Sequence, residues 1–456
     1  MSDADLIVIG AGMAGINAAA RASEAEASVI VIERDRVGGT CPIRGCIPSK
    51  ALIRSAEVAH EVRTAAGYGI AVEGFSIDMG AVTDRVQAII DKGAAGARGY
   101  LESLPGLRLV MGEARFEEPG VVTVGGERLT APRVLVASGA EPIVLPIPGL
   151  AQTPHLTSTD VLALRELPGR LLVIGAGPIG LELGQALSRL GARVTIIEVA
   201  PRLLAQADPE VGEALAELLT AEGIELILGA SIERVGLRAG GGPRITATWD
   251  GATRVLDGDA ILLGAGRGPA VEALALATAG IETRRTGIPV DARLETSRPG
   301  HFAAGDVLGP PYGAFTHTAR QLGRDAAENA LGIDPHEANP DVGPRAIFTD
   351  PEFATVGMTE AEARAAGHDV GVGTSRFSGG KARAWGQERG LVKVVVDRAA
   401  RRILGAHILA YHGADLIHPL VVAMRAGDPD AILGAYHVHP TLGEPVQGAV
   451  RAAFSG

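Results

Sequence analysis

Short apolar runs of strand length alternate with segments of helical character along most of this chain. The runs at residues 6–9 and 28–32 flank an alanine-rich segment, and those at 171–174 and 194–197 flank residues 181–190, which also read as a helix. Continuous apolar runs that alternate with helices are typical of a parallel sheet covered by helices. The pattern therefore predicts an α/β fold that contains two βαβ units.

A glycine-rich turn follows the first strand of each predicted unit. The spacing Gly-x-Gly-x-x-Gly occurs at Gly10, Gly12 and Gly15, and again at Gly175, Gly177 and Gly180. These glycines allow a tight turn, a close approach of a pyrophosphate and close packing of helix on strand. A turn needed only for packing could explain one copy. Two copies in the same context predict two bound dinucleotides.

The second strand of each unit ends in a glutamate. Glu33 and Glu198 both lie 23 positions after the first glycine of their unit. A carboxylate at this place accepts hydrogen bonds from ribose hydroxyls and repels a 2′-phosphate. Glu198 therefore favours NAD over NADP, and the nearby Arg202 is interpreted as a solvated residue after a turn.

The chain contains two cysteines, Cys41 and Cys46, separated by four residues. A bend at Gly45 would bring them within disulfide range, and Pro48 is placed as in the first turn of a helix. The partial positive charge at that helix start would stabilise a Cys46 thiolate. A structural disulfide is disfavoured because the closed loop is so short, and a metal site because further ligands are missing. The pair is interpreted as redox-active, with no metal.

Composition narrows the function classes. The 456 residues carry a net charge of −11 and no basic stripe, which argues against a nucleic-acid partner. The acidic start is unlike a secretory signal, and no apolar run reaches the length of a membrane span. We therefore expect a cytoplasmic protein that does not associate with a membrane.

Two further candidates lie in the second half of the chain. Asp306 ends a strand-like stretch, where it could be a turn residue or a ligand contact. His439 stands before a proline with Glu444 five residues on, which suits a general base held by an acid. A metal-site fragment and a surface turn remain open for this histidine. Strand-like runs at 391–396 and 403–409 indicate that the last part of the chain has a different architecture.

Seven motifs in this order resemble those of the flavin-dependent pyridine nucleotide–disulfide oxidoreductases, and most closely those of the dihydrolipoamide dehydrogenases. They lie at residues 10–15, 38–41, 45–50, 175–182, 304–306, 348–352 and 439–442. The resemblance implies two Rossmann-like dinucleotide-binding domains and a C-terminal α+β dimerisation domain. Its expected boundaries are 1–150 for FAD, 151–270 for NAD, 271–338 for a central segment that completes the FAD site, and 339–456 for the interface domain.

The resemblance also implies roles for individual residues. Cys46 would touch the flavin of FAD, and Cys41 would exchange with substrate. His439 would come from the partner subunit of a homodimer, oriented by Glu444, and Lys50 would pair with Glu182 beside the flavin. Asp306 would bind the ribityl chain. The other expected cofactor contacts are Gly39, Thr40, Ser138, Gly139, Gly266 and Gly305.

The expected function is oxidation of dihydrolipoyl groups, on a small dithiol or a lipoyl-bearing protein, with NAD+ as acceptor. One alternative is an NAD(P)H-dependent reductase of another disulfide or of mercuric ion, although the chain lacks cysteines near its C-terminal end. The other is a flavoprotein NAD sensor or electron carrier without disulfide cycling. Arg44, between the cysteines, predicts a lower thiolate pKa or a preference for an acidic substrate. Gly443 stands where the family often has a serine just before the glutamate, so the fine positioning of Glu444 is left open.

Overall fold

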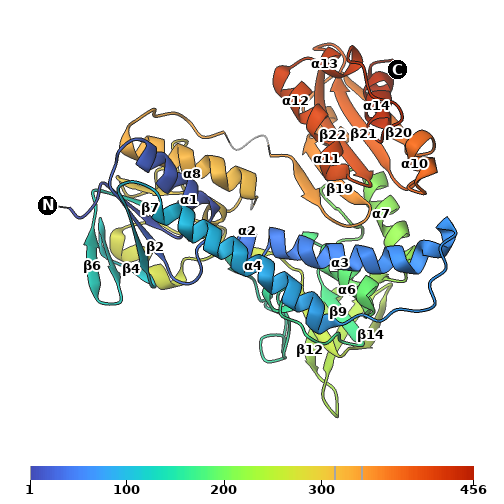
Figure 1. Cartoon of the computed structure of the whole chain (residues 1–456), viewed down its shortest axis with the longest axis horizontal. Coiled ribbons are helices and arrows are strands. Elements are labelled where there is room, and N and C mark those ends of the chain that lie inside the picture. Colours follow the sequence, from blue (N-terminus) through green and yellow to red (C-terminus); the bar gives the residue numbers. More distant parts are fainter. Residues whose placement is uncertain (1, 313–314, 340–342, 456) are drawn as a thin grey trace.

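A computed structural model describes residues 2–312, 315–339 and 343–455 (Figure 1). The first sheet is parallel, with strand order β17-β7-β1-β2-β3. Its strands are almost entirely apolar and buried at the centre, so helices cover it. Its elements are β1 (Leu6–Ile9), β2 (Val29–Glu33), β3 (Leu107–Met111), β7 (Arg133–Val136), β17 (His301–Ala303), α1 (Met13–Glu24) and α8 (Thr316–Leu331).

An antiparallel β-meander packs on the same hydrophobic core as the first sheet. It comprises β4 (Ala114–Glu118), β5 (Val121–Val124) and β6 (Glu127–Thr130), and the short helices η2 (Glu272–Leu274), η3 (Leu276–Ala279) and η4 (Asp306–Leu308) complete this part of the chain. Residues 301–303 pair with β7, so a segment from beyond the second βαβ unit closes the first sheet.

The second parallel sheet has the order β11-β10-β9-β15. It contains β9 (Arg170–Ile174), β10 (Arg193–Ile197), β11 (Glu225–Ile227) and β15 (Ala260–Leu263), with α5 (Ser158–Val161), α6 (Pro178–Leu190) and α7 (Pro209–Ala221). An antiparallel sheet of β12 (Ser231–Leu237), β13 (Pro243–Trp249) and β14 (Ala252–Asp257) shares a core with it. The predicted βαβ units are thus both present. In each unit the first apolar run forms a strand, a glycine turn and a helix follow it, and the second apolar run forms a parallel strand beside the first.

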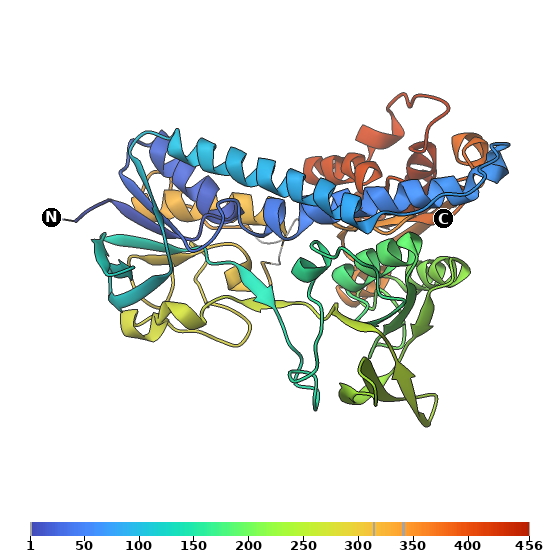
Figure 2. The same cartoon turned by 60° about the horizontal axis from the view of Figure 1, so that its bottom comes forward.

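Two long helices together extend from one half of the molecule to the other (Figure 2). They are α3 (Cys46–Thr64) and α4 (Met79–Glu102), which pack on each other and, through α3, on α6. The remaining short elements of this region are α2 (Thr40–Ile43) and η1 (Ala65–Tyr68). Among the described residues, no helix is both long and apolar enough to cross a membrane.

The last part of the chain forms an antiparallel sheet of order β18-β19-β22-β21-β20. Its strands are β18 (Arg345–Ile347), β19 (Glu352–Gly357), β20 (Val370–Arg376), β21 (Leu391–Asp397) and β22 (Arg402–Ala410). The helices are α9 (Glu360–Ala365), α10 (Gly380–Ala384), α11 (Gly413–Leu416), α12 (His418–Ala426), α13 (Asp430–Leu433) and α14 (Glu444–Ser455). The amphipathic α14 packs on β20 and β21. This α+β arrangement confirms the predicted change of architecture.

Three local expectations need correction. The sequence pattern of residues 51–112 predicts mainly helix, but 107–111 form the edge strand β3, which pairs with β2. The three prolines among residues 142–148 predict a segment without regular structure. Pro142 ends the short strand β8 (Ala140–Pro142), which pairs with β16 (Arg267–Pro269). A two-stranded sheet tolerates proline because its edges are free. Between Gly39 and Gly45 the chain forms the short helix α2 as well as a bend.

Candidate functional site

A cavity of about 1220 Å³ joins the two glycine turns and the cysteine pair. Most of the residues predicted to form the site line it. They are Gly10, Gly12, Glu33, Gly39, Thr40, Cys41, Cys46, Lys50, Ser138, Gly139, Gly175, Gly177, Glu182, Glu198, Gly266, Gly305 and Asp306. Four predicted residues are outside the lining: Gly15, Gly180, His439 and Glu444.

The third glycine of each turn serves packing. A Cβ atom at Gly15 would lie 1.8 Å from the carbonyl oxygen of Gly10, and one at Gly180 would lie 2.0 Å from that of Gly175. Both distances are far below van der Waals contact, so any side chain would push the helix off the turn. Gly15 and Gly180 therefore allow the start of each helix to pack against the strand. The other two glycines of each turn can face a ligand.

The two glutamates are held in the same way. Glu33 accepts hydrogen bonds from the backbone N–H of Ala11, at 2.8 Å, and from that of Asp35, at 2.9 Å. Glu198 accepts from the N–H of Ala176, at 2.6 Å, and of Ala200, at 2.8 Å. Each carboxylate is therefore fixed at the mouth of its glycine turn. Each oxygen retains acceptor capacity for a ribose hydroxyl.

The cavity walls fit a dinucleotide in the first unit. A Cβ atom at Gly39 would meet the Cα of Gly12 at 2.5 Å, so two backbone segments approach closely beside the glycine turn. Among the described residues, the buried Ser138 Oγ and Arg267 Nε have no hydrogen-bond partner. Buried polar atoms are normally paired, and a bound cofactor would supply the partner. Glu33, the glycine turn, Ser138 and Asp306 would hold FAD.

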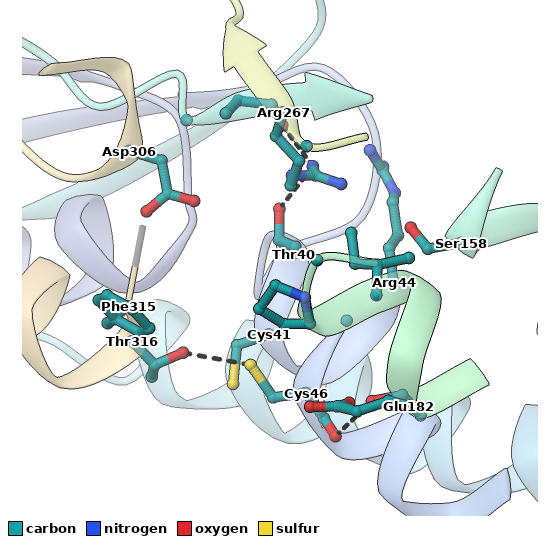
Figure 3. Close-up of a pocket in the computed structure, with 18 of the residues that line it drawn as sticks. Thr40, Cys41, Arg44, Cys46, Ser158, Glu182, Arg267, Asp306, Phe315 and Thr316 are labelled. Atoms are coloured by element: carbon teal, nitrogen blue, oxygen red, sulfur yellow. Dashed lines mark hydrogen bonds between the residues drawn. The ribbon is translucent and has the colours of Figure 1, made fainter. Parts of the chain in front are cut away.

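Cys41 and Cys46 lie side by side on consecutive helices (Figure 3). Cys41 is in α2, and Cys46 is the first residue of α3, as the sequence predicted. Both cysteines are free in this structure. The Cys46 sulfur also lies 3.4 Å from the hydroxyl oxygen of Thr316, the first residue of α8.

The environment of the pair separates the acidities of its two thiols. A hydrogen bond from Cys41 lowers the pKa of Cys46 to about 6, against the opposing effect of burial, and Thr316 and Lys50 lower it further. The same bond to Cys46 raises the pKa of Cys41, which keeps its proton. Cys46 is thus the thiolate and Cys41 the thiol at neutral pH.

This separation predicts the pH dependence of alkylation. The thiolate is the nucleophile, so the alkylation rate of the reduced protein should rise with pH and reach half its plateau near pH 6. The measurement is the iodoacetamide rate constant from pH 5 to 9, with the modified residue identified by mass spectrometry. In Cys46→Ser, Cys41 loses the partner that raises its pKa most, but burial still raises it, so Cys41 should titrate above the ordinary value of about 8.5. A wild-type midpoint above that value would contradict the assignment.

Lys50 lies four residues after Cys46 and forms an ion pair across the cavity. Its Nζ is 2.7 Å from Glu182 Oε2 and 4.1 Å from the centre of the Phe348 ring. The other oxygen of Glu182 accepts the backbone N–H of Phe348 at 3.0 Å. The structure thus brings together helices α3 and α6 and the segment before β19, and it leaves the ammonium group beside the cysteines.

Asp306 and Arg267 both line the cavity (Figure 3). Burial raises the pKa of Asp306, and the positive charge of Arg267 opposes that rise. Arg267 donates to the carbonyl oxygen of Ala140 and to Thr40 Oγ1, the latter at 3.4 Å. The sequence patterns singled out neither Arg267 nor Thr316. The position of Arg267 directly after Gly264-Ala265-Gly266 was a usable signal, because ligands bind beyond the carboxyl ends of parallel strands.

Arg44 was expected either to lower a thiolate pKa or to favour an acidic substrate, and its contacts bear on the first of these. Its guanidinium forms an ion pair with Asp35. The cationic contribution to the lowered Cys46 pKa comes from Lys50 instead. The expectation that Arg44 sets the thiolate acidity is therefore not supported by this geometry.

His439 and Glu444 form a pair that lies away from the cysteines of the same chain. His439 Nδ1 is 2.5 Å from Glu444 Oε1. The other oxygen of Glu444 accepts the backbone N–H of Thr441 at 3.4 Å. The hydrogen bond from His439 is the main cause of a lowered pKa of Glu444. The His439 side chain is 74% exposed and lies outside the cavity lining. Within one chain, then, the predicted acid–base group does not reach the predicted redox pair.

Comparisons with known proteins agree with this arrangement. Residues 4–328 match the family described as pyridine nucleotide-disulphide oxidoreductase, and residues 343–450 match the dimerisation domain of the same family. The dihydrolipoyl dehydrogenase of Bacillus subtilis is 35% identical over 98% of both chains. A mercuric reductase of Bacillus cereus is also 35% identical, over 93% of this chain and 67% of that protein.

A solved structure shows the same fold. It is the Cu(II) complex of the HOCl-induced flavoprotein disulfide reductase RclA from Escherichia coli. The TM-score is 0.87 at 30% identity, and the match covers 100% of this chain and 99% of that one. The similarity therefore extends over the sheets that carry the cavity and over the C-terminal part.

Proposed function

Because this chain belongs to the pyridine nucleotide-disulphide oxidoreductases, FAD-containing enzymes that use NAD(P)H, we propose that it oxidises dihydrolipoyl groups with NAD+. The observation that carries the proposal is a pair of cysteines with different thiol pKa values, a low one for Cys46 and a raised one for Cys41. The pair lines the same cavity as the two glycine turns. When bound, FAD supplies the group that exchanges electron pairs with sulfur and with a nicotinamide. Side chains of the protein carry out the thiol exchange and the proton transfer.

The exchange with a dithiol proceeds in two steps at Cys41. A substrate thiolate attacks Cys41 of the oxidised pair, and the Cys41–Cys46 bond breaks with Cys46 leaving as thiolate. The second substrate thiol then displaces Cys41 from the mixed disulfide. In total, a dithiol and the protein disulfide give a substrate disulfide, a Cys41 thiol, a Cys46 thiolate and one proton. A low pKa makes Cys46 a good leaving group.

The released proton needs an acceptor near Cys41. We assign this role to His439 of a partner subunit, since His439 of the same chain is exposed and distant from the cavity lining. The dimerisation domain at residues 343–450 supports a homodimer as the active unit. Glu444 would hold Nδ1 and leave Nε2 to accept the proton. The resemblance to the family implies the same arrangement.

A reductase of another disulfide, or of mercuric ion, is the second candidate. The relative from Bacillus cereus named as a mercuric reductase is as similar in sequence as the dihydrolipoyl dehydrogenase is. Both candidates use Cys41 and Cys46. The chain has no other cysteine with which to bind a metal ion on its way to the pair, and this favours the dithiol.

The deciding experiment compares substrates on the purified holoenzyme. FAD is first confirmed by its absorption spectrum. Initial rates are then measured with dihydrolipoamide and a dihydrolipoyl-bearing protein in the NAD+ direction, and with oxidised glutathione, lipoamide and Hg²⁺ in the NADH direction. We expect the highest kcat/KM for a lipoyl substrate. A higher value for mercuric ion or another disulfide would replace the proposal by the second candidate.

The cofactor preference is tested at Glu198. Its carboxylate repels a 2′-phosphate, so Glu198→Gln should lower the ratio of kcat/KM for NAD+ to that for NADP+ by about tenfold. The matched control is Glu33→Gln, at the equivalent position of the first unit. It should weaken FAD retention and leave the NAD+ to NADP+ ratio unchanged. An unaltered ratio in Glu198→Gln would mean that another residue sets the preference.

A further inference from the structure

The hydroxyl of Thr316 is placed against the redox sulfurs by the fold alone. Thr316 Oγ1 lies 3.4 Å from Cys46 Sγ, although 270 residues separate them in sequence. Figure 3 shows the hydroxyl on the opposite side of the sulfurs from Glu182. The contact forms because α8 packs on α1 of the first sheet and thereby brings its first residue to the start of α3.

The identity of the hydrogen donor depends on the redox state of Cys46. A thiolate carries no hydrogen, so the threonine hydroxyl must donate to it. In the disulfide, the same sulfur is a neutral, weak acceptor, and the bond contributes little. Hydrogen bonds to charged groups are about twice as strong as neutral ones. The contact thus stabilises the reduced form more than the oxidised form.

We propose that Thr316 is a positioning residue that holds Cys46 as a thiolate through a hydrogen bond from its hydroxyl, and so makes the Cys41–Cys46 disulfide a stronger oxidant. The inference deepens the proposed function, on which it rests for the identity of the dithiol. The half-reaction is the disulfide plus two electrons and one proton giving a Cys46 thiolate and a Cys41 thiol. Stabilising the thiolate moves that equilibrium toward the reduced side.

The charged groups around the cysteine pair do not replace the effect of the Thr316 hydroxyl on the Cys46 thiolate. Lys50 of α3 is paired with Glu182 of α6, which reduces its effect on the sulfur. The other titratable or charged groups near the pair line the same cavity or act on its thiols. They are Cys41 of α2, Arg44 after α2, which is paired with Asp35, Lys50 of α3, Glu182 of α6, Arg267 of β16, Asp306 of η4, His317 and Arg320 of α8, and His418 of α12. Among these neighbours, Thr316 is the neutral donor at the sulfur, and it lowers the pKa of Cys46.

The test uses two substitutions of Thr316 in the FAD-loaded dimer. Thr316→Val keeps the shape of the side chain and removes the donor, whereas Thr316→Ser keeps the donor. The control is Thr318→Val, two residues further along α8, for which the described residues show no hydrogen bond to either sulfur. The readouts are the pH midpoint of Cys46 alkylation in the reduced protein and the midpoint potential of the pair against a glutathione buffer.

Thr316→Val should raise the alkylation midpoint by about one pH unit, and Thr316→Ser and Thr318→Val by less than about 0.3. At pH 7 a rise of the Cys46 midpoint from about 6 to about 7 lowers the weight of the reduced state about fivefold, which corresponds to a potential about 20 mV more negative in Thr316→Val. An unchanged midpoint in Thr316→Val, or an equal shift in Thr316→Ser, would overturn the inference. Neither readout uses a lipoyl substrate, so a failure of the proposed function leaves this test intact.

Discussion

Cys41→Ser is expected to lower the rate of dihydrolipoamide oxidation by about a thousandfold or more, because disulfide exchange passes through a mixed disulfide at this sulfur. Serine keeps the size of the side chain and cannot form that bond. Cys41 lines the cavity beside Cys46, and its proton stays in place at neutral pH, so its loss removes the exchange partner and little of the surrounding structure. The measurement is kcat/KM for dihydrolipoamide with NAD+.

The same variant provides its own control. Reduction of the bound FAD by NADH does not require a sulfur, so its rate in stopped-flow absorbance should stay within about threefold of the wild type. Retained FAD and an unchanged unfolding temperature would exclude a folding defect. Undiminished dithiol turnover in Cys41→Ser would show that the pair does not cycle, and would support the interpretation as an electron carrier or NAD sensor.

His439→Gln should slow dithiol oxidation by about 10²- to 10⁴-fold, the range expected when a general acid–base is lost. Glutamine can still hydrogen-bond to Glu444 but cannot take up a proton. NADH reduction of the bound FAD should be unaffected. The control is His437→Gln on the same loop, where Nε2 of the histidine lies 2.9 Å from the carbonyl oxygen of Ile432 and away from Glu444. Its effect should stay below about threefold.

Mixed dimers test whether His439 acts across the subunit interface. A dimer of one Cys41→Ser subunit and one His439→Gln subunit has one site with both intact groups only if the histidine comes from the partner. Random reassortment of the two inactive homodimers should then restore about a quarter of the wild-type activity, since half of the dimers are mixed and each has one working site. If mass spectrometry shows mixed dimers but activity does not recover, His439 acts on the cysteines of its own subunit or takes no part in the reaction.

Local sequence signals located most of the cavity. The glycine turns, Glu33 and Glu198 follow apolar runs whose length and order are encoded within about 30 residues, so their structure could be predicted without long-range contacts. Cys46 at the start of a helix was predicted from Pro48 alone and is found there. The strand β3 was missed because Arg108 and the half-exposed edge position weaken its apolar pattern.

Long-range contacts explain what was missed. Arg267 reaches Thr40 across 227 residues, and Arg44 is neutralised by Asp35 on a neighbouring turn. The charge at Arg44 was visible in the sequence, whereas its partner depended on how α2 packs beside β2. Lys50 and Glu182 could be paired only through resemblance to a family, since 132 residues separate them.

Short periodic patterns, and turns that few residues can form, were enough to identify the two nucleotide-binding units, the family and a cysteine pair at a helix start. The packing of the folded chain fixed which groups lie around the sulfurs, Thr316 from α8 and Lys50 held by Glu182, and it left the pair of His439 and Glu444 on an exposed loop. Side-chain chemistry at this site arises where separate sheets and helices meet, and no local pattern records which segments will pack together.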